Sequence, residues 1–318
     1  MATKNNNEIE IKSVAQFLNK VTKICINKDE IKLQNVFFRG EADVNWKTVA
    51  SLLRDDLCSG GTIQSDVYVQ LENQLIDEAK IYNPQLFESC HNSIDKLVEM
   101  QHYGLPTRLL DVTTNPLIAL YFACESTNAD GRVLYIKQKP VPGDLANLIA
   151  TLCEFYKSNI YEHHSLSTFL KILKEHNLFQ EDEDYKVRFL FEYITKSFLY
   201  VHPYINERMK AQKGAFVFSA FMQPFLKDTK YNKLLKRMKR SKVTGEELDS
   251  ISFDKTSVSF QFEKKHFIIR KDDKKRILKE LDLIGINEAF VYPEPEHQMR
   301  TVKERVVMSN MTKEQFYS

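Results

Sequence analysis

The sequence predicts a single α+β domain of 318 residues in which helices flank a β-sheet and a helical insertion interrupts the second half. Three observations predict this class. Short segments rich in β-branched and aromatic residues alternate with longer segments in which apolar residues recur at helical spacing. No internal repeat is visible, and no Pro-, Gly- or Ser-rich linker divides the chain. With 43% apolar and 28% charged residues, the chain can bury a sizeable core.

In the first half of the chain, helices and strands are expected to alternate. Apolar residues at helical spacing predict helices over residues 10–28, 65–82 and 92–102. A short apolar strand is expected over Val36–Phe38, ending at Arg39-Gly40. A second strand is expected over 131–137, GRVLYIK, because aromatic and β-branched residues alternate there with other types.

In the second half, an insertion at 142–200 is expected to hold three helices, over roughly 144–157, 165–176 and 184–199. Strands are expected over 214–221 and 264–270. The stretch KDDKKRILKELDLIG then predicts a helix that Gly285 ends. One face of this helix is apolar and consists of Ile277, Leu278, Leu281 and Ile284.

Composition excludes several classes of protein. The formal charge of +2 does not mark the whole chain as a nucleic-acid binder. No apolar run approaches the roughly 18 residues that span a bilayer, and the polar start MATKNNNEIEIKS lacks the apolar core of a secretory signal. The five cysteines are scattered, which favours reduced thiols and a cytoplasmic location. His163-His164 and His202 lack metal-ligand spacing, so we expect no metal site.

The stretch QHYGLPTRLLDVTTNPLIALYFA, residues 101–123, concentrates unusual residue types. Gly104 and Pro106 predict a tight turn, since glycine tolerates a positive φ and proline fixes its own. Asn115 followed by Pro116 predicts a helix start, with Asn115 as the N-cap. The apolar helix that follows is expected to be buried. Its N-terminus offers free N–H groups and the positive end of the helix dipole, which suit a phosphate.

Two interpretations of the polar residues in this stretch stay open on physical grounds. Arg108 and Asp111 either form a buried ion pair that holds the turn, with Thr113 and Thr114 capping the helix, or these residues line a ligand site. Arg39, Arg108 and Thr113 are expected to face one cleft. The neighbouring pair His102-Tyr103 is either functional or structural.

Two further predictions concern Trp46 and a basic segment. Trp46 is expected to pack beneath the segment that contains it. The segment KDTKYNKLLKRMKRSK, residues 227–242, carries eight Lys or Arg against one Asp. Such a run is usually a solvated helix face, but with Tyr231 among the charges it also suits contact with RNA or DNA.

Several blocks of the sequence resemble the FRG domain, a family named for its Phe-Arg-Gly triplet, which is Phe38-Arg39-Gly40 here. The first block, FFRGEADVNWKTVASLLRD, spans 37–55, and the second, MQHYGLPTRLLDVTTNPLIALYFA, spans 100–123. A third, INERMKAQKGAFVFSAF, spans 205–221, and the closing strand-helix-Pro pattern spans 269–298. The resemblance implies a helical segment at 1–30, then an FRG domain over 31–310 with insertions at 142–200 and 224–262. FRG-domain proteins are mostly bacterial and phage-associated, and some are linked to anti-phage defence.

A second resemblance concerns chemistry. The stretch LLDVTTNPLIALYFA is similar to a strand-(Ser/Thr)-Thr pattern of Arg-Ser-Glu ADP-ribosyltransferases. This likeness implies a small, partly split sheet, NAD as the substrate, Arg39 on the NAD ribose and phosphates, and Thr113-Thr114 beside the nicotinamide. It implies no metal. The residues expected to bind NAD are Arg39, Gly40, His102, Tyr103, Arg108, Asp111 and Asn115.

The catalytic acid does not follow the transferase pattern, which has Gln/Glu-x-Glu where this chain has Gln212-Lys213-Gly214. Glu207 or Glu263 is the expected substitute. The predicted catalytic set is Arg39, Thr113, Thr114, Gln212 and Glu207. Two functions therefore stay open. One is an NAD-dependent ADP-ribosyltransferase that acts on nucleic acid or protein as a toxin or defence effector. The other is a non-enzymatic module that recognises a nucleotide, a nucleic acid or a protein partner such as an antitoxin or phage component.

Overall fold

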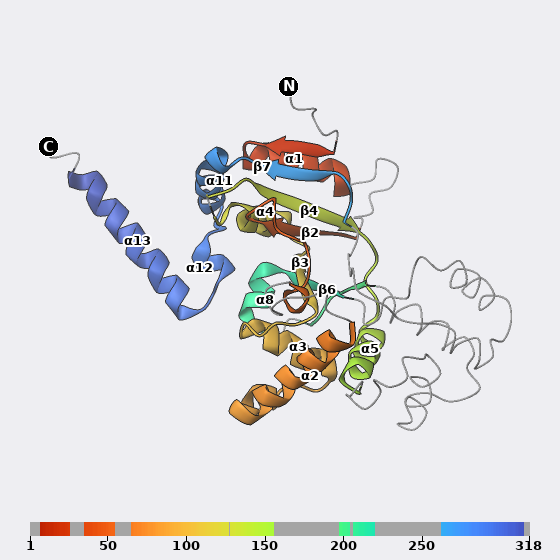
Figure 1. Ribbon diagram of the computed structural model, residues 1–318. Coiled ribbons are helices and arrows are strands. Elements are labelled where there is room, and N and C mark those ends of the chain that lie inside the picture. Colours follow the sequence, from red (N-terminus) through yellow and green to blue (C-terminus); the bar gives the residue numbers. More distant parts are fainter. Residues whose placement is uncertain are drawn as a thin grey trace.

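The computed structural model describes residues 7–25, 35–54, 65–126, 128–155, 197–203, 206–219 and 262–314. The strands of this part are β1 (Glu8–Ile11), β2 (Val36–Glu41), β3 (Leu109–Thr113), β4 (Gly131–Lys137), β5 (Phe198–Tyr200), β6 (Gly214–Phe218) and β7 (His266–Ile269). They form one open sheet in the order β1-β7-β4-β2-β3-β6-β5 (Figure 1). β1 and β7 are parallel, and the other neighbours are antiparallel. The mixed class is thus confirmed, although seven strands exceed the small sheet that was expected.

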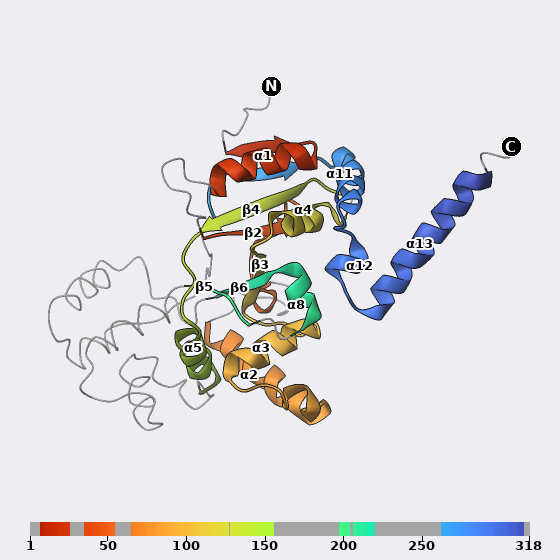
Figure 2. The same ribbon diagram turned by 180° about the vertical axis from the view of Figure 1, so that it is seen from behind.

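Helices cover both halves of the sheet (Figure 2). The helices are α1 (Val14–Cys25), α2 (Ser65–Tyr82), α3 (Ser93–His102), α4 (Pro116–Cys124), α5 (Gly143–Phe155), α8 (Glu207–Gln212), α11 (Lys271–Leu283), α12 (Glu288–Val291) and α13 (Pro295–Glu314), with 3₁₀ turns η1 (Ser51–Leu53) and η3 (Pro84–Phe87). α4 contacts β2 and β4, and α1 and α11 lie with it, whereas α2, α3 and α5 pack together near β3. α13 projects away from the body. Within the described residues, no helix has the length and apolar character to cross a membrane.

The sheet is weakest between its two central strands. β2 pairs with β4 over six residues and β3 pairs with β6 over five, but β2 and β3 share one aligned pair, Phe38 and Thr113. A sheet joined at a single pair leaves backbone groups on either side of the junction without strand partners. The candidate site lies at this junction.

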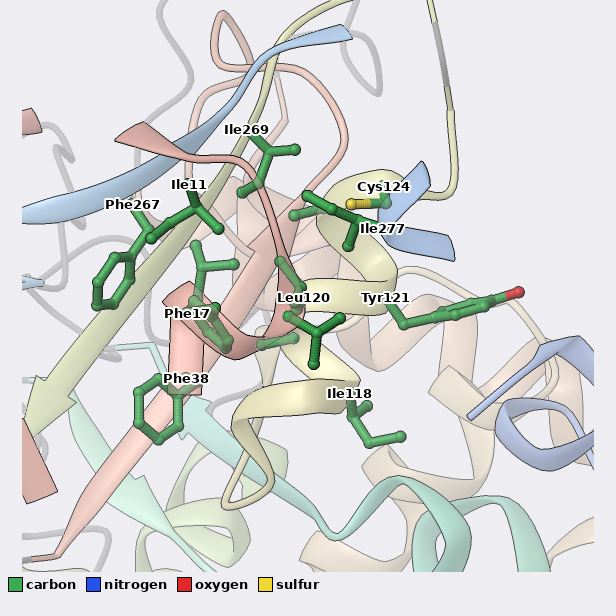
Figure 3. Packing of buried hydrophobic residues seen from close by; sticks show 14 of the residues in the cluster. Ile11, Phe17, Phe38, Ile118, Leu120, Tyr121, Cys124, Phe267, Ile269 and Ile277 are labelled. Carbon is green, nitrogen blue, oxygen red and sulfur yellow. The ribbon is translucent and has the colours of Figure 1, made fainter. Parts of the chain in front are cut away.

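The larger hydrophobic core lies between α4 and the β2 side of the sheet (Figure 3). Ile118, Leu120 and Cys124 of α4 are fully buried in the same core as Phe38. A Cβ at Gly40 would lie 1.9 Å from the carbonyl oxygen of Ala119, so no side chain fits there. The glycine of the Phe-Arg-Gly triplet therefore lets α4 pack directly on β2.

A smaller core lies on the opposite face of the sheet. Its buried members are Phe37, Ala50, Leu110, Val112, Ile136, Leu199, Ala215 and Val217. Phe37 belongs to this core and Phe38 to the larger one, because successive side chains of a strand point to opposite faces. The central strands are thus buried on both sides, and a polar residue on them needs a specific partner or an opening.

Most predicted elements match the structure, with differences at their ends. The helix expected over 10–28 begins at Val14, because Glu10 and Ile11 extend β1 along β7. β2 runs on through Arg39 and Gly40 to Glu41, since β4 continues to pair with it. Gly285 has a φ of +84° and ends α11, as predicted.

The helix expected over 184–199 is wrong at its end. Residues 198–200 form β5, which pairs with β6, and the ring of Phe198 stacks on Phe218 with centroids 4.9 Å apart. Long-range pairing overrides local helical spacing here, because a Phe-Leu-Tyr segment suits a strand. The helix expected over 144–157 is confirmed as α5. The helix expected over 165–176, residues 184–196 of the next expected helix and residues 224–261 of the basic insertion lie outside the described residues.

Candidate functional site

A pocket of about 270 Å³ lies where β2 and β3 diverge. Its walls come from β2, β3, β6, α3, α8 and the loop that follows β2. Of the residues predicted for the site, six line it: Arg39, Gly40, His102, Asp111, Thr113 and Gln212. These residues come from segments up to 173 positions apart in the sequence. The fold therefore brings together residues of all three FRG-like blocks, at 37–55, 100–123 and 205–221.

Arg39 bridges the gap between the diverging strands. Its Nη1 donates a hydrogen bond to the backbone carbonyl of Asp111 at 2.8 Å, and its Nε donates to Glu41 Oε1 at 2.9 Å. The first bond satisfies a carbonyl that has no strand partner on the β2 side. Within the described part of the chain, Nη2 of Arg39 has no hydrogen-bond partner. Arg39 is therefore both a structural bridge and a cation at the pocket wall.

Glu41 is the buried centre of a charged network behind this wall. Its side chain is 1% exposed, and its carboxylate accepts hydrogen bonds from Arg39, from Arg132 Nε at 2.8 Å and from Thr48 Oγ1 at 3.0 Å. One carboxylate lies between two guanidinium groups, so the network as a whole carries excess positive charge. Arg132 Nη2 also donates to the carbonyl of Trp46 at 2.6 Å. This network thus holds the loop after β2 and Arg39 together.

Asp111 is the exposed residue of an otherwise buried strand. Its neighbours in β3 are buried, as expected for a central strand covered on both faces, while the Asp111 side chain opens into the pocket. Gln101 Nε2 donates to Asp111 Oδ1 at 2.7 Å. The amide orientation of Gln101 is fixed in turn, because the Thr107 hydroxyl donates to Gln101 Oε1 while accepting from the N–H of Leu109. A chain of directed hydrogen bonds therefore orients an accessible carboxylate.

Thr113 and Thr114 make hydrogen bonds that differ from the helix cap or ligand contacts expected from the sequence. Thr113 Oγ1 donates to the carbonyl of Gln212 at 2.6 Å and accepts from the N–H of Asn115 at 2.9 Å. Thr114 Oγ1 donates to the carbonyl of Lys213 at 3.4 Å. Both hydroxyl protons are thus directed at the end of α8, which they fasten to β3. Thr113 lines the pocket, but Thr114 does not.

Gln212 is fixed at the other wall. Its Nε2 donates to the carbonyl of Val291 at 3.0 Å. The next residue, Lys213, has a φ of 50°, and in the described part of the chain it is the one non-glycine residue with a positive φ. This left-handed turn ends α8 and starts β6, and it costs about 1 kcal/mol relative to glycine. Such strain is most often kept beside functional residues.

Asn115 caps α4 as predicted, and its Oδ1 accepts from the N–H of Leu117 at 3.0 Å. Asn115 does not line the pocket, so the start of α4 is held by the chain's own cap.

Arg108 neither pairs nor lies as expected from the sequence. It is 3% exposed, and its Nε donates to Glu72 Oε2 of α2 at 2.6 Å, while its backbone N–H donates to Glu72 Oε1 at 3.1 Å. It neither pairs with Asp111 nor faces the cleft. The partner lies on a helix 36 positions earlier, which no local pattern indicated. Arg108 therefore joins α2 to the sheet.

Three other predicted residues lie away from the pocket. Tyr103 is 64% exposed and contacts His102 edge-on with ring centroids 5.0 Å apart. The side chain of Glu207 is 78% exposed and faces Lys210 at 3.7 Å. Glu263 donates its backbone N–H to the carbonyl of Tyr135. Neither substitute for the missing catalytic acid lines the pocket. Among the described residues, no three His, Cys, Asp or Glu side chains gather as metal ligands.

The structure adds pocket residues that the sequence did not indicate. Glu125, just after α4, accepts a hydrogen bond from the Tyr292 hydroxyl at 2.5 Å. Burial and this bond raise the pKa of Tyr292, so the tyrosine stays the donor. Arg208 of α8 lies over the Tyr292 ring, with its guanidinium carbon 4.8 Å from the centroid. Glu125 follows a buried helix, where nothing in the sequence marks a site.

Trp46 also lines the pocket and is 53% exposed, so the expectation that it packs beneath its own segment is wrong. Its backbone is fixed by neighbouring residues, which leaves the ring free to face solvent. The sequence feature that could have indicated Trp46 as a pocket residue is its position in the first FRG-like block.

Comparison with known families finds a match for the part of the chain that contains most of the pocket residues. Residues 34–132 match the family model of the FRG domain. The matched residues include Arg39, Glu41, Trp46, Asp111 and Glu125, whereas Arg208 and Gln212 lie beyond them. No curated protein and no solved structure matches the chain. The match supports the FRG resemblance; the likeness to ADP-ribosyltransferases has no such support.

Proposed function

We propose that the pocket at the FRG domain binds NAD and that the protein transfers its ADP-ribosyl group to an acceptor. The observation that carries this proposal is the accessible, oriented carboxylate of Asp111, which lies on a buried strand beside Arg39. A central strand buried on both faces does not retain an exposed carboxylate for stability, because an apolar residue would pack better there.

The charges of the pocket match those of NAD. Arg39 and Arg208 offer two guanidinium groups, which suit the pyrophosphate, and Asp111 and Glu125 offer two carboxylates. NAD carries anionic phosphates and a cationic nicotinamide ring, so it needs both signs of charge in one site. The unpaired Nη2 of Arg39 is the group we assign to a phosphate or ribose oxygen.

Asp111 is the residue we assign to the reacting centre. In the transfer step, the bond between ribose C1′ and the nicotinamide nitrogen breaks, and its electron pair leaves with neutral nicotinamide. The carboxylate stabilises the positive charge that develops on the ribose and accepts the proton of the attacking acceptor group. Glu125 is the less favoured alternative, since its Oε1 already accepts the short bond from Tyr292.

The test is incubation of the protein with labelled NAD and cell lysate, followed by measurement of label in RNA, DNA and protein. Asp111→Asn keeps the size and the bond from Gln101 but removes the charge, so it should lower transfer by about 10²- to 10⁴-fold. Asp77→Asn is the matched control, because its side chain is 69% exposed on α2. Full transfer by Asp111→Asn would assign the chemistry to another residue.

A second candidate function rests on a different observation. The pattern's glutamate is replaced by Gly214, and Arg39 already contacts Glu41 and the Asp111 carbonyl. Both facts favour a recognition module that binds a nucleotide without turnover. In that case NAD or a related nucleotide should raise the melting temperature, while no label is transferred. From the FRG resemblance, we propose that either activity serves anti-phage defence or toxin action.

A further inference from the structure

The ring of Trp46 is an exposed aromatic surface at a pocket that also contains charged side chains. Among the described residues, several large apolar side chains are exposed, and Trp46 is the one of them that lines the pocket. An exposed indole ring leaves much of its apolar surface in water, where burying it would stabilise the protein. At a pocket, that surface is available to a flat ligand.

Hydrogen bonds hold the backbone of Trp46 in place. Its N–H donates to the carbonyl of Asp43 at 3.2 Å, and its carbonyl accepts from Arg132 at 2.6 Å. The carboxylate of Asp43 accepts the N–H of Asn45 at 2.8 Å, which fixes the turn. Glu41 then ties Arg132 to Arg39. The backbone of Trp46 and the pocket cation are thus supported by one buried carboxylate, which is typical of a preorganised binding site.

We infer that Trp46 stacks on the flat heteroaromatic ring of a nucleoside phosphate whose phosphate lies at Arg39. This inference rests on the part of the proposed function that places a nucleotide in the pocket, and it names the residue that selects the ring. A pocket of about 270 Å³ is slightly smaller than ordinary ligand sites, so it encloses one ring of NAD with its ribose phosphate, and the other half of the dinucleotide lies outside it.

The inference can be tested directly because Trp46 is the one tryptophan in the sequence. Excitation at a wavelength that tyrosine does not absorb reports on this ring alone. The probes are nicotinamide mononucleotide, AMP and ribose 5-phosphate. The two nucleotides share the stacking chemistry, and the more strongly quenching one identifies the half of NAD that Trp46 contacts. We expect saturable quenching by at least one nucleotide, and competition without quenching by ribose 5-phosphate.

Variants separate stacking from other effects. Trp46→Leu should weaken binding of the quenching nucleotide by roughly tenfold to a hundredfold, the range for one base on one aromatic ring, as measured by calorimetry. Trp46→Phe keeps a flat ring and should restore most of the affinity. Tyr82→Leu removes an aromatic ring that is 85% exposed and lies outside the pocket, and this variant should bind as the parent does.

The outcomes distinguish this inference from the proposed transfer reaction. Nucleotide binding without quenching, absence of binding by both nucleotides, or parental affinity in Trp46→Leu would overturn the stacking role. Quenching in the parent protein, together with weaker binding by Trp46→Leu, would support the stacking role. If the parent protein also transfers no label, the transferase function is overturned. Transfer with an unchanged KM for NAD in Trp46→Leu would do the reverse.

Discussion

At the scale of single residues, the site depends on groups that serve the fold and face the pocket at once. Arg39 satisfies the Asp111 carbonyl at the sheet junction, pairs with the buried Glu41 and lines the pocket. A guanidinium can do all three because its donors point in different directions within one plane. A lysine ammonium at the same position lacks that fixed geometry. The two roles of Arg39 can therefore be separated by experiment.

Arg39→Lys should lower both stability and NAD affinity. The loss of one charge-assisted bond in the network should lower the free energy of unfolding by about 1.5–3 kcal/mol, and the loss of a bidentate donor should weaken NAD binding by about tenfold to a hundredfold. Thermal melting and calorimetry measure the two effects. Thr48→Val is the control, since it removes a bond to Glu41 but leaves the guanidinium. Unchanged NAD affinity in Arg39→Lys would make Arg39 a purely structural bridge.

At the scale of elements, the close contact of α4 with β2 sets the position of Arg39 relative to β3. Gly40 is paired with Val133 of β4 and lies against the backbone of α4. Because Gly40 directly follows Arg39, the pocket cation lies next to the point where α4 packs on β2. The Phe-Arg-Gly triplet thus combines a core residue, a pocket cation and a packing gap in three consecutive positions.

Gly40→Ala should be strongly destabilising, because the new Cβ would lie 1.9 Å from the Ala119 carbonyl oxygen and 2.8 Å from the Ala123 nitrogen. These are backbone atoms, which do not move aside as a flexible side chain would. We expect a loss of at least about 2–3 kcal/mol, measured by urea unfolding. Gly143→Ala is the matched control, since its nearest contact would be 3.8 Å away. A loss under 0.5 kcal/mol for Gly40→Ala would contradict the close packing of α4 on β2.

Local signals in the sequence predicted most of these elements, and long-range contacts account for what they missed. Asn115-Pro116 predicted the start of α4, because capping depends on neighbouring residues. β5 was not predicted, since a three-residue strand is fixed by its pairing with β6. The pair of Arg108 with Glu72 joins residues 36 positions apart, and the role of Glu125 depends on Tyr292, which is 167 positions away. Arg39 and Asp111 could be predicted from the two sequence blocks, but the second carboxylate of the site, Glu125, could not.

At the scale of the whole molecule, positive charge is concentrated in one segment. Residues 227–242 carry eight basic residues and one acidic residue, whereas the whole chain has a net charge of +2, so the rest of the chain is net negative. This segment lies outside the described residues. A polyanion would be repelled by most of the chain and attracted to this segment. Nucleic-acid contact there can therefore be tested by substitutions in this segment alone.

If this segment binds RNA or DNA, neutralising Lys236, Arg237, Lys239 and Arg240 to Gln should weaken binding and flatten its salt dependence. Each phosphate contact contributes about 0.9 to the slope of log K against log salt on duplex DNA and about 0.7 on single strands, so the loss of four contacts should reduce the slope by roughly 3. Filter binding or fluorescence anisotropy over a salt series measures it. The control neutralises four lysines that are exposed on α1 and α11, namely Lys20, Lys23, Lys275 and Lys279. Equal slopes for both variants would assign residues 227–242 to an ordinary solvated surface. A slope reduced only in the first variant, together with label in RNA or DNA, would make this segment the part that brings a nucleic-acid acceptor to the pocket.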